Sequence, residues 1–145
     1  MDIRVQEAAF DVGAVLNDFT ARTSGMGAVV TFNGIVRGDG GLTAMEIEHY
    51  PGMTQNALSQ IAEDAGARWA LGDVLVIHRF GTLTPGETIM MVATCAPHRT
   101  DAFQAAEFLM DYLKSRAPFW KREIGPDGAA WVAAKDSDED ALSRW

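Results

Sequence analysis

Apolar and polar residues follow two periodicities along this chain, and together they predict an ordered mixture of strands and helices. Strands are expected where apolar residues alternate with polar ones or where β-branched residues concentrate: 2–6, 28–36, 43–50, 73–80, 87–95, 119–124 and 129–134. Helices are expected where apolar residues recur every three or four positions: from the N-cap Asp11 to about Arg22, from Thr54 to about Leu71, and from Arg99 to about Lys114.

The order of these elements predicts an α+β fold with a mainly antiparallel sheet, rather than a doubly wound fold. Strands 73–80 and 87–95 are expected to form a hairpin around the loop 81–86, and a second hairpin is expected around residues 126–128. The glycine-rich segment 38–41 is predicted to be a flexible loop. An acidic tail from about residue 136 is predicted to be solvated. No repeat or linker divides the chain, so residues 1–145 are expected to form a single domain.

Composition and charge narrow the class of protein. The 145 residues carry 12 Lys and Arg against 20 Asp and Glu, a net charge of −8, which disfavours a binder of nucleic acid or of an anionic membrane. The N-terminus lacks an apolar signal-peptide core, and no apolar run approaches the roughly 20 residues of a membrane span. A single cysteine cannot form an internal disulfide. These features predict a cytoplasmic protein.

The positive charge is unevenly distributed along the sequence. Half of the Lys and Arg residues lie between positions 79 and 122, with His98 among them: Arg79, Arg99, Lys114, Arg116, Lys121 and Arg122. A local basic region in an acidic protein suits a small anionic ligand, such as a phosphate or carboxylate, because the overall field repels polyanions. The alternative is that these cations are scattered over a solvated surface.

Position within the predicted elements favours some of these cations as site residues. His98 and Arg99 begin a helix, where free N–H groups attract anions, although His98 could instead cap or pack and Arg99 could pair with a carboxylate. Lys114 lies in the last turn of that helix, where a cation is also favourable without any ligand. Strand alternation places Phe119, Lys121 and Glu123 on one side, so Lys121 is either a desolvated acid or base, or a solvated edge lysine.

Three weaker signals, for a nucleophilic pair, a metal site and a nucleotide-binding loop, each have a simpler explanation. Cys95 with His98 could form a nucleophilic pair, but a lone cysteine in an apolar strand is more often a buried hydrophobe. The three histidines are too dispersed to predict a metal site, and no cofactor is expected. The loop 38–41 lacks the context of a nucleotide-binding loop and could be a mobile lid beside Arg37.

A set of short motifs in fixed order gives a more specific indication. These are FNGIVR at 32–37, EHYPGM at 48–53, HRFG at 78–81, HR at 98–99, DYLK at 111–114, PFWKRE at 118–123 and WV at 131–132. Their order and spacing over about residues 28–135 resemble the catalytic (large) subunit family of molybdopterin synthase. The resemblance implies an α/β hammerhead type of α+β fold with an additional small antiparallel subdomain.

The resemblance also implies an activity and partners. The family converts cyclic pyranopterin monophosphate to molybdopterin by inserting two dithiolene sulfurs, and it needs no metal or cofactor for this. The sulfur is donated by the C-terminal Gly-Gly thiocarboxylate of a small ubiquitin-like partner subunit. Two large subunits form a central homodimer within a heterotetramer. The alternative considered is a non-catalytic scaffold that binds a phosphorylated pterin or a ubiquitin-like tail.

Site roles follow from the same motifs. Arg37, His98 and Arg99 are expected to bind the substrate, while Lys121 and Lys114 are expected to be catalytic, with either lysine able to take the other's role. Lys135 stands where some relatives carry arginine and is expected to bind substrate as well. The resemblance leaves open whether Lys135 acts in its own pocket or across the dimer. Cys95 has no role in this scheme, because the partner supplies the sulfur.

Overall fold

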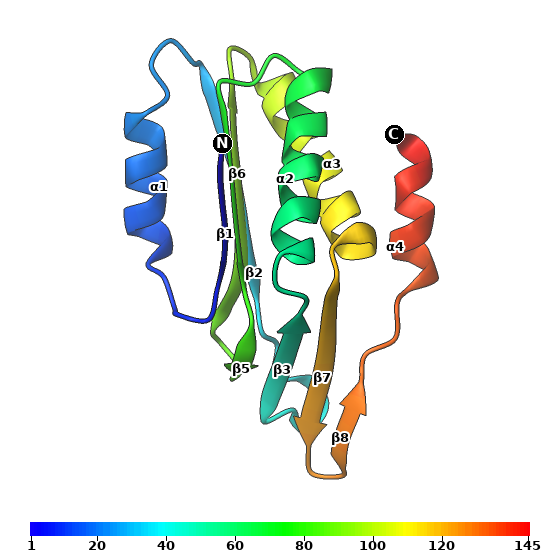
Figure 1. Ribbon diagram of the computed structural model, residues 1–145. Helices are drawn as coiled ribbons and strands as arrows, with labels where there is room; N and C mark the ends of the chain where they lie inside the picture. Colours follow the sequence, from blue (N-terminus) through cyan, green and yellow to red (C-terminus); the bar gives the residue numbers. More distant parts are fainter.

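The computed structural model describes all 145 residues and contains two four-stranded sheets (Figure 1). The first sheet has the strand order β1 (Asp2–Gln6), β4 (Asp73–Arg79), β6 (Thr88–Ala96) and β2 (Ala28–Ile35). The second has the order β5 (Gly81–Leu83), β3 (Ala44–His49), β7 (Phe119–Gly125) and β8 (Gly128–Trp131). The helices are α1 (Val12–Ala21), α2 (Met53–Arg68), α3 (Arg99–Arg116) and α4 (Asp136–Ala141), and short 3-10 turns occupy η1 (Asp39–Gly41) and η2 (Leu142–Arg144).

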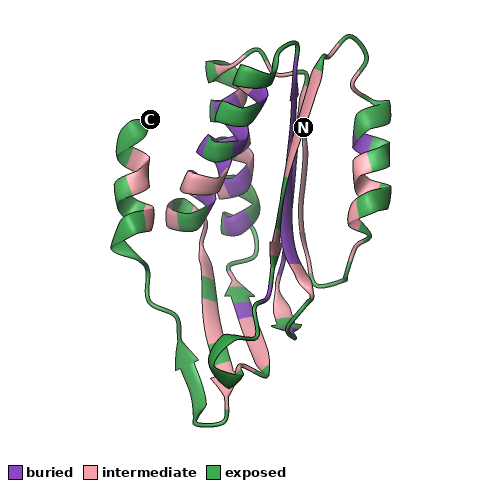
Figure 2. Ribbon diagram, turned by 180° about the vertical axis from the view of Figure 1, so that it is seen from behind, coloured by how far each residue is buried: buried purple, intermediate pink, exposed green.

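Helices cover both faces of the first sheet, with α1 on one side and α2 and α3 on the other (Figure 1). This arrangement explains why the four central residues of β4, 74–77, are all apolar. Val74 and Val76 pack in the core that includes α2 and α3, whereas Leu75 and Ile77 pack with Phe19 of α1. Figure 2 shows the buried residues concentrated in this sheet and on the inner sides of α2 and α3.

The predicted α+β class with mainly antiparallel sheets is confirmed. Only β1 and β4 pair in parallel, and every other pairing in both sheets is antiparallel. The hairpin of β4 and β6 forms as expected, with Asp73 opposite Cys95. The N-cap of α1 is also as predicted, since the Asp11 carboxylate accepts a hydrogen bond from the Ala14 N–H at 3.0 Å.

Two segments differ from the sequence-based expectation. The supposed loop after β4 contains β5, which pairs with β3 and buries Leu83, so this turn joins the two sheets. The acidic segment expected to be a solvated tail forms the helix α4, and Arg116 of α3 binds Glu139 of α4. No helix in the protein combines the length and the apolar character that crossing a membrane demands.

Candidate active site

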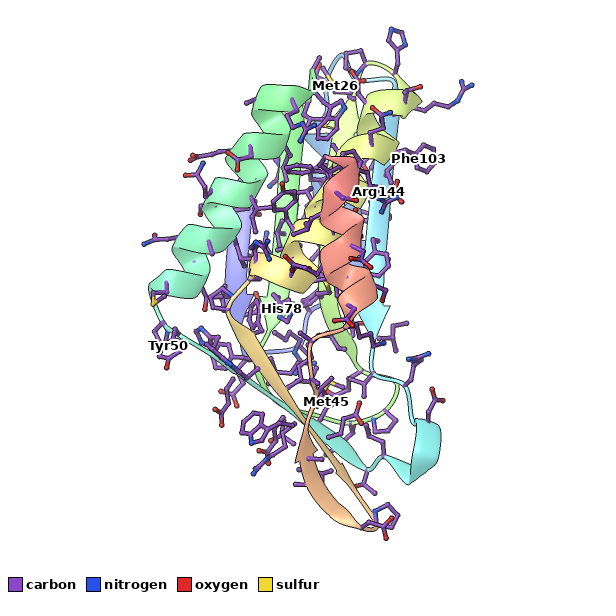
Figure 3. All side chains as sticks on the ribbon, turned by 90° about the vertical axis from the view of Figure 1, so that its right-hand side faces the viewer. Met26, Met45, Tyr50, His78, Phe103 and Arg144 are labelled. Atoms are coloured by element: carbon purple, nitrogen blue, oxygen red, sulfur yellow. The ribbon has the colours of Figure 1, made fainter.

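A cavity of about 540 Å³ lies where the second sheet meets the C-terminal end of α3. Its wall is formed by the ends of β2 and α3, by β7, and by the segment that leads from β8 into α4. Four cations line it: Arg37, Lys114, Lys121 and Lys135. Figure 3 faces this part of the molecule and labels two further lining residues, Met45 and His78. The cavity therefore collects positive charge in a protein whose net charge is −8.

The two lysines are placed by neighbouring elements on either side of Pro118. Lys114 lies in the last turn of α3, and Lys121 is the third residue of β7. Strand alternation puts Lys121 on the same side as Phe119, and both side chains line the cavity, as the sequence predicts. Burial and, to a smaller extent, the positive charge of Lys114 lower the pKa of Lys121 to about 8. Lys121 can therefore exchange a proton near neutral pH.

Three other cations of the basic region are held in structural contacts. Arg79 is buried and donates hydrogen bonds to the carbonyl of Glu7 and to the Glu87 carboxylate. Arg116 and Arg122 pair with Glu139 and Glu46 respectively. In contrast, Lys114, Lys121 and Lys135 form no ion pair, and Arg37 has only a 3.6 Å contact with the exposed Asp39. Apart from Arg99 at the other end of α3, the unpaired cations of the basic region therefore lie at the cavity, together with Arg37 and Lys135.

His78 is a cavity residue that the sequence did not indicate as one. Its ring stacks on Phe119 with the centroids 3.7 Å apart, and its Nδ1 lies 2.8 Å from the Arg79 carbonyl. Because a carbonyl only accepts, Nδ1 carries the proton and Nε2 is left as an acceptor. Burial lowers the pKa of His78 to about 3, with Lys121 adding to the effect, so the ring is neutral. Two signals were available: a histidine that follows the apolar run of β4, and its place in the HRFG motif at 78–81.

The segment between β8 and α4 completes the cavity wall. Val132, Ala133, Ala134 and Lys135 all line the cavity, and Asp138 reaches it from the first turn of α4. The backbone N–H of Val132 donates to the Lys121 carbonyl at 2.8 Å, which ties this segment to β7. Lys135 therefore lines the cavity of its own chain. Asp138 was not foreseen, because its position depends on how α4 packs against α3.

His98 and Arg99 lie at the other end of α3, and both are exposed. Arg99 and Lys114 are 15 positions apart, which corresponds to about 22 Å along a helix axis at 1.5 Å per residue. Figure 3 shows this separation, because Phe103, one turn after Arg99, is far from Met45 at the cavity. Within one chain, the cavity thus brings together Arg37, Lys114, Lys121 and Lys135, whereas His98 and Arg99, which were also expected to bind substrate, lie outside it.

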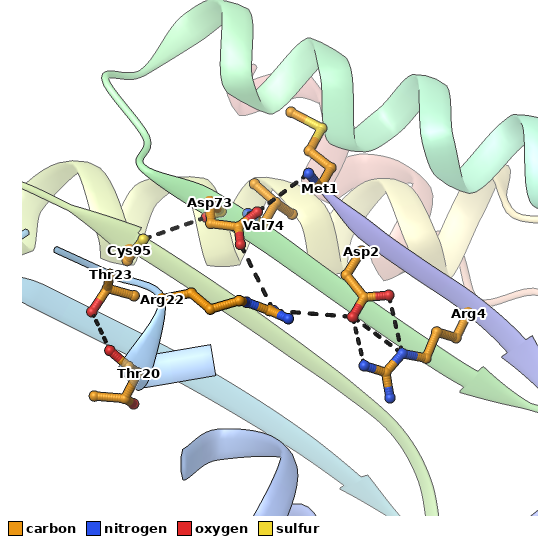
Figure 4. Close-up of polar contacts among 9 residues, drawn as sticks. All are labelled: Met1, Asp2, Arg4, Thr20, Arg22, Thr23, Asp73, Val74 and Cys95. Atoms are coloured by element: carbon orange, nitrogen blue, oxygen red, sulfur yellow. Dashed lines mark hydrogen bonds and ion pairs between the residues drawn. The ribbon is translucent and has the colours of Figure 1, made fainter. Parts of the chain in front are cut away.

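Cys95 lies in the core under α1, remote from the cavity lysines. Its side chain is fully buried and its Sγ lies 3.8 Å from the Asp73 carbonyl, beside the contact between Arg22 and Asp73 (Figure 4). Burial raises the pKa of the Cys95 thiol, which disfavours the nucleophilic thiolate. Among the candidate explanations, the buried small hydrophobe fits this geometry. The protein also has no cluster of three or more His, Cys, Asp or Glu side chains suited to a metal ion.

The fold and cavity define a class of protein: an α+β protein whose two sheets meet at a pocket lined by three lysines and an arginine. Comparisons with known proteins identify the family. The family model described as "MoaE protein" matches residues 5–116. The molybdopterin synthase catalytic subunit of Cereibacter sphaeroides is 61% identical over 146 residues, covering all of both chains. The chain belongs to the MoaE family.

Solved structures agree with this assignment. A molybdopterin biosynthesis MoaE protein from Burkholderia ambifaria superimposes with a TM-score of 0.86 at 51% identity, covering 99% of this chain and 97% of that one. A complex of subunits 1 and 2 of the molybdopterin-converting factor from Helicobacter pylori gives a TM-score of 0.78 at 18% identity, covering 92% and 90% of the two chains, which shows a shared fold.

Proposed function

We propose that this chain is the catalytic subunit of a molybdopterin synthase, an enzyme of molybdenum cofactor biosynthesis that acts in the cytoplasm. Its substrate would be cyclic pyranopterin monophosphate, and its sulfur donor would be the thiocarboxylate of a small ubiquitin-like partner subunit. The observation that carries the proposal is the cavity, where Lys114 and Lys121 stand without carboxylate partners beside Arg37 and Lys135. The family membership and the 61% identity to a catalytic subunit support it.

The chemistry of the reaction matches this set of side chains. Arg37 and Lys135 offer cationic donors to the substrate's phosphate, which binds guanidinium groups through charge-assisted hydrogen bonds. The partner's thiocarboxylate is an anion, and the cavity's positive charge attracts it. Its sulfur forms a bond to a substrate carbon as the bond from that carbon to oxygen breaks. Water then attacks the acyl carbon through a tetrahedral anionic intermediate and breaks the acyl–sulfur bond, which releases the partner's carboxylate and leaves the sulfur on the substrate. An ammonium group beside that intermediate stabilises the developing charge.

The two lysines take different parts in this scheme. Lys121, with a pKa of about 8, is the acid whose ammonium protonates the leaving oxygen, and its neutral amine can then take up a proton again, because both protonation states exist near neutral pH. Lys114 is exposed at the end of α3 and adds charge that attracts the anions. A scaffold that only binds the pterin or the partner would have no need of a lysine with a lowered pKa. The catalytic function is therefore favoured over the scaffold.

The separation of Arg99 from Lys121 supports a homodimer as the working unit. If His98 and Arg99 bind substrate, a second copy must bring them to the pocket, since a rigid helix holds them apart within one chain. The edge strand β2 offers a surface for this pairing. It is eight residues long, its outer edge is unpaired, and Phe32 and Ile35 are exposed to 42% and 55%. The other edge strand, β1, is shorter and carries the charged pair Asp2 and Arg4.

A reconstituted reaction tests this function. The purified chain, the partner with its thiocarboxylate and cyclic pyranopterin monophosphate are expected to give dithiolene product in a single turnover without added metal or ATP. The Lys121→Ala variant is expected to remain folded by circular dichroism and to form no product. Binding of both components without any product from the wild-type chain would support the scaffold instead. Full activity of Lys121→Ala would remove the catalytic role assigned to Lys121.

A further inference from the structure

The segment after β8 is anchored by Trp145, which packs on the outer side of α2 and α3. Its ring makes edge-on contacts with Trp69 and Phe108, with both centroid distances at 5.6 Å. Its Nε1–H donates to the Asp111 carboxylate at 2.7 Å. Its carbonyl accepts a hydrogen bond from Arg68 at 3.0 Å. Trp145 therefore joins both helices through apolar and polar contacts together.

Arg144 adds ion pairs to the same region. Its guanidinium lies 2.8 Å from Glu107 and 2.7 Å from Asp111, so Asp111 receives both Arg144 and the Trp145 indole. Figure 3 shows Arg144 at the helix that ends the chain, alongside α3. We call Arg144 and Trp145 together the Trp145 clasp. Its contacts are made with α2 and α3, the helices that form the rigid core of the domain.

The helix between the clasp and the cavity has little stability of its own. α4 has six residues, fewer than the roughly 12 that an isolated helix needs in water, and none of its side chains is buried. Its other anchor is the exposed pair of Arg116 with Glu139, and exposed ion pairs contribute about 0–1 kcal/mol. The clasp supplies the apolar burial that α4 lacks, so the position of α4 depends on the clasp.

The beginning of α4 is the part that reaches the cavity. Lys135 is its N-cap residue and Asp138 lies in its first turn, and both line the cavity. We propose that Arg144 and Trp145 are positioning residues, which hold Lys135 and Asp138 in the cavity wall by fixing α4 against α3. This inference rests on the proposed function, because the cavity that the clasp completes is the one assigned to the reaction.

Lys121 is the residue on which the positioning acts. The charges of Lys114 and Lys135 lower the pKa of Lys121 and that of Asp138 raises it. The segment that carries Lys135 and Asp138 lines the same cavity as Lys121. When the clasp is released, water gains access to Lys121, and burial is the largest cause of its lowered pKa. The clasp therefore helps to keep the pKa of Lys121 near neutral pH, although its own residues lie outside the cavity.

The first test measures the position of the segment without any reaction. Backbone amide hydrogen exchange is followed in wild type, Trp145→Ala and Trp145→Phe. Trp145→Ala is expected to speed exchange at Val132 and at residues 138–139, whose N–H groups bond to Lys121 and Lys135, by at least about tenfold, with the α3 core unchanged. Trp145→Phe keeps the ring and is expected to restore most of the protection. Unchanged protection in Trp145→Ala would overturn the inference.

The second test is a double-mutant cycle on kcat/KM in the reconstituted enzyme. Trp145→Ala and Lys135→Ala are each expected to lower kcat/KM about tenfold, and the double variant about tenfold rather than a hundredfold, because both remove the same contribution. The inflection of the pH profile is expected to move upward in Trp145→Ala. Arg4→Ala, on the opposite face, is the control and is expected to behave as wild type. Multiplicative losses with an unmoved inflection would contradict the positioning role, whereas an inactive wild type would contradict the proposed function alone.

Discussion

His78 of β4 and Phe119 of β7 stack with an interplanar angle of 16° and centroids 3.7 Å apart, and this contact joins the first sheet to the second beside Lys121. The stack holds the imidazole away from water, so the ring is neutral although it lies near two lysines. The same contact fixes the start of β7, whose third residue is Lys121. The buried His78 and the partly buried Phe119 thus form part of the wall of the cavity that carries the proposed chemistry.

The neutral state of His78 predicts how stability depends on pH. The pKa of His78 is about 3 in the folded protein and 6.5 ordinarily, so between these values the unfolded chain binds more protons. Wild-type stability is therefore expected to fall as pH drops from about 6.5 towards 3, with this group adding up to about 1.4 kcal/mol per pH unit. His78→Phe keeps the stacking and removes that contribution.

Urea unfolding at several pH values measures this effect. The difference between wild type and His78→Phe is expected to be constant above pH 7, where the imidazole is neutral in both states, and to shift in favour of the variant as the pH is lowered. Parallel stability curves for the two proteins from pH 7 to pH 4 would show that His78 gains its proton while folded, contrary to the buried neutral ring.

The lowered pKa of Lys121 predicts that this lysine destabilises the folded protein although the proposed reaction needs it. Its folded pKa of about 8 lies below the ordinary 10.5, so the unfolded chain binds more protons between these values and wild-type stability is expected to rise with pH across that range. Lys121→Met removes this dependence. At pH 7 it is expected to stabilise the fold by about 1–3 kcal/mol while abolishing conversion.

Thermal or urea unfolding at pH 7 and pH 10 checks the prediction for Lys121. Lys114→Met is the matched control, because Lys114 lines the same cavity but is exposed. The free energy of unfolding of this variant is expected to differ from that of wild type by less than about 0.5 kcal/mol. A Lys121→Met variant that is less stable than wild type at pH 7 would mean that the ammonium is solvated in the folded state.

A mixing experiment tests whether two copies share a pocket. Arg99→Ala and Lys121→Ala chains are each expected to be inactive alone. The two variants are unfolded and refolded together in equal amounts, so random pairing makes half of the dimers hybrids. Each hybrid has one intact pocket out of two. Activity is therefore expected to return to about a quarter of wild type. Recovery of no activity, with hybrid dimers detected by native mass spectrometry, would show that Arg99 serves no pocket of the neighbouring chain.

Substitution of Cys95 distinguishes the proposed function from that of a hydrolase in which Cys95 and His98 would form the nucleophilic pair. Because Cys95 is buried under α1 and remote from the cavity, Cys95→Ala is expected to keep full conversion. The substitution leaves a small void in the core, which is expected to lower the free energy of unfolding by about 1–2 kcal/mol. The reconstituted assay and a urea titration measure the two quantities. Loss of product formation in a folded Cys95→Ala protein would mean that the thiol takes part in the reaction.

Much of the fold was predictable because its signals are local. The almost continuous apolar run in Thr88–Ala96 and the three- and four-residue spacing in Met53–Arg68 reflect which side chains face the core, and each can be seen within one segment. β5 was missed because three residues carry no periodicity, and its pairing partner β3 lies more than thirty positions earlier. α4 was missed because its acidic residues suit a solvated tail and its anchors are on other helices.

The sequence by itself determined the α+β class, the side of β7 on which Lys121 lies, and the place of Lys114 at the end of a helix, because backbone periodicity fixes these directions. It also contained the separation of Arg99 from Lys114, since a helix of known length is rigid. Only the tertiary structure decided which charges remain unpaired at the cavity, that His78 is buried there, and that Trp145 holds Lys135 in its wall. These depend on contacts between residues distant in the chain, and no local pattern encodes such contacts.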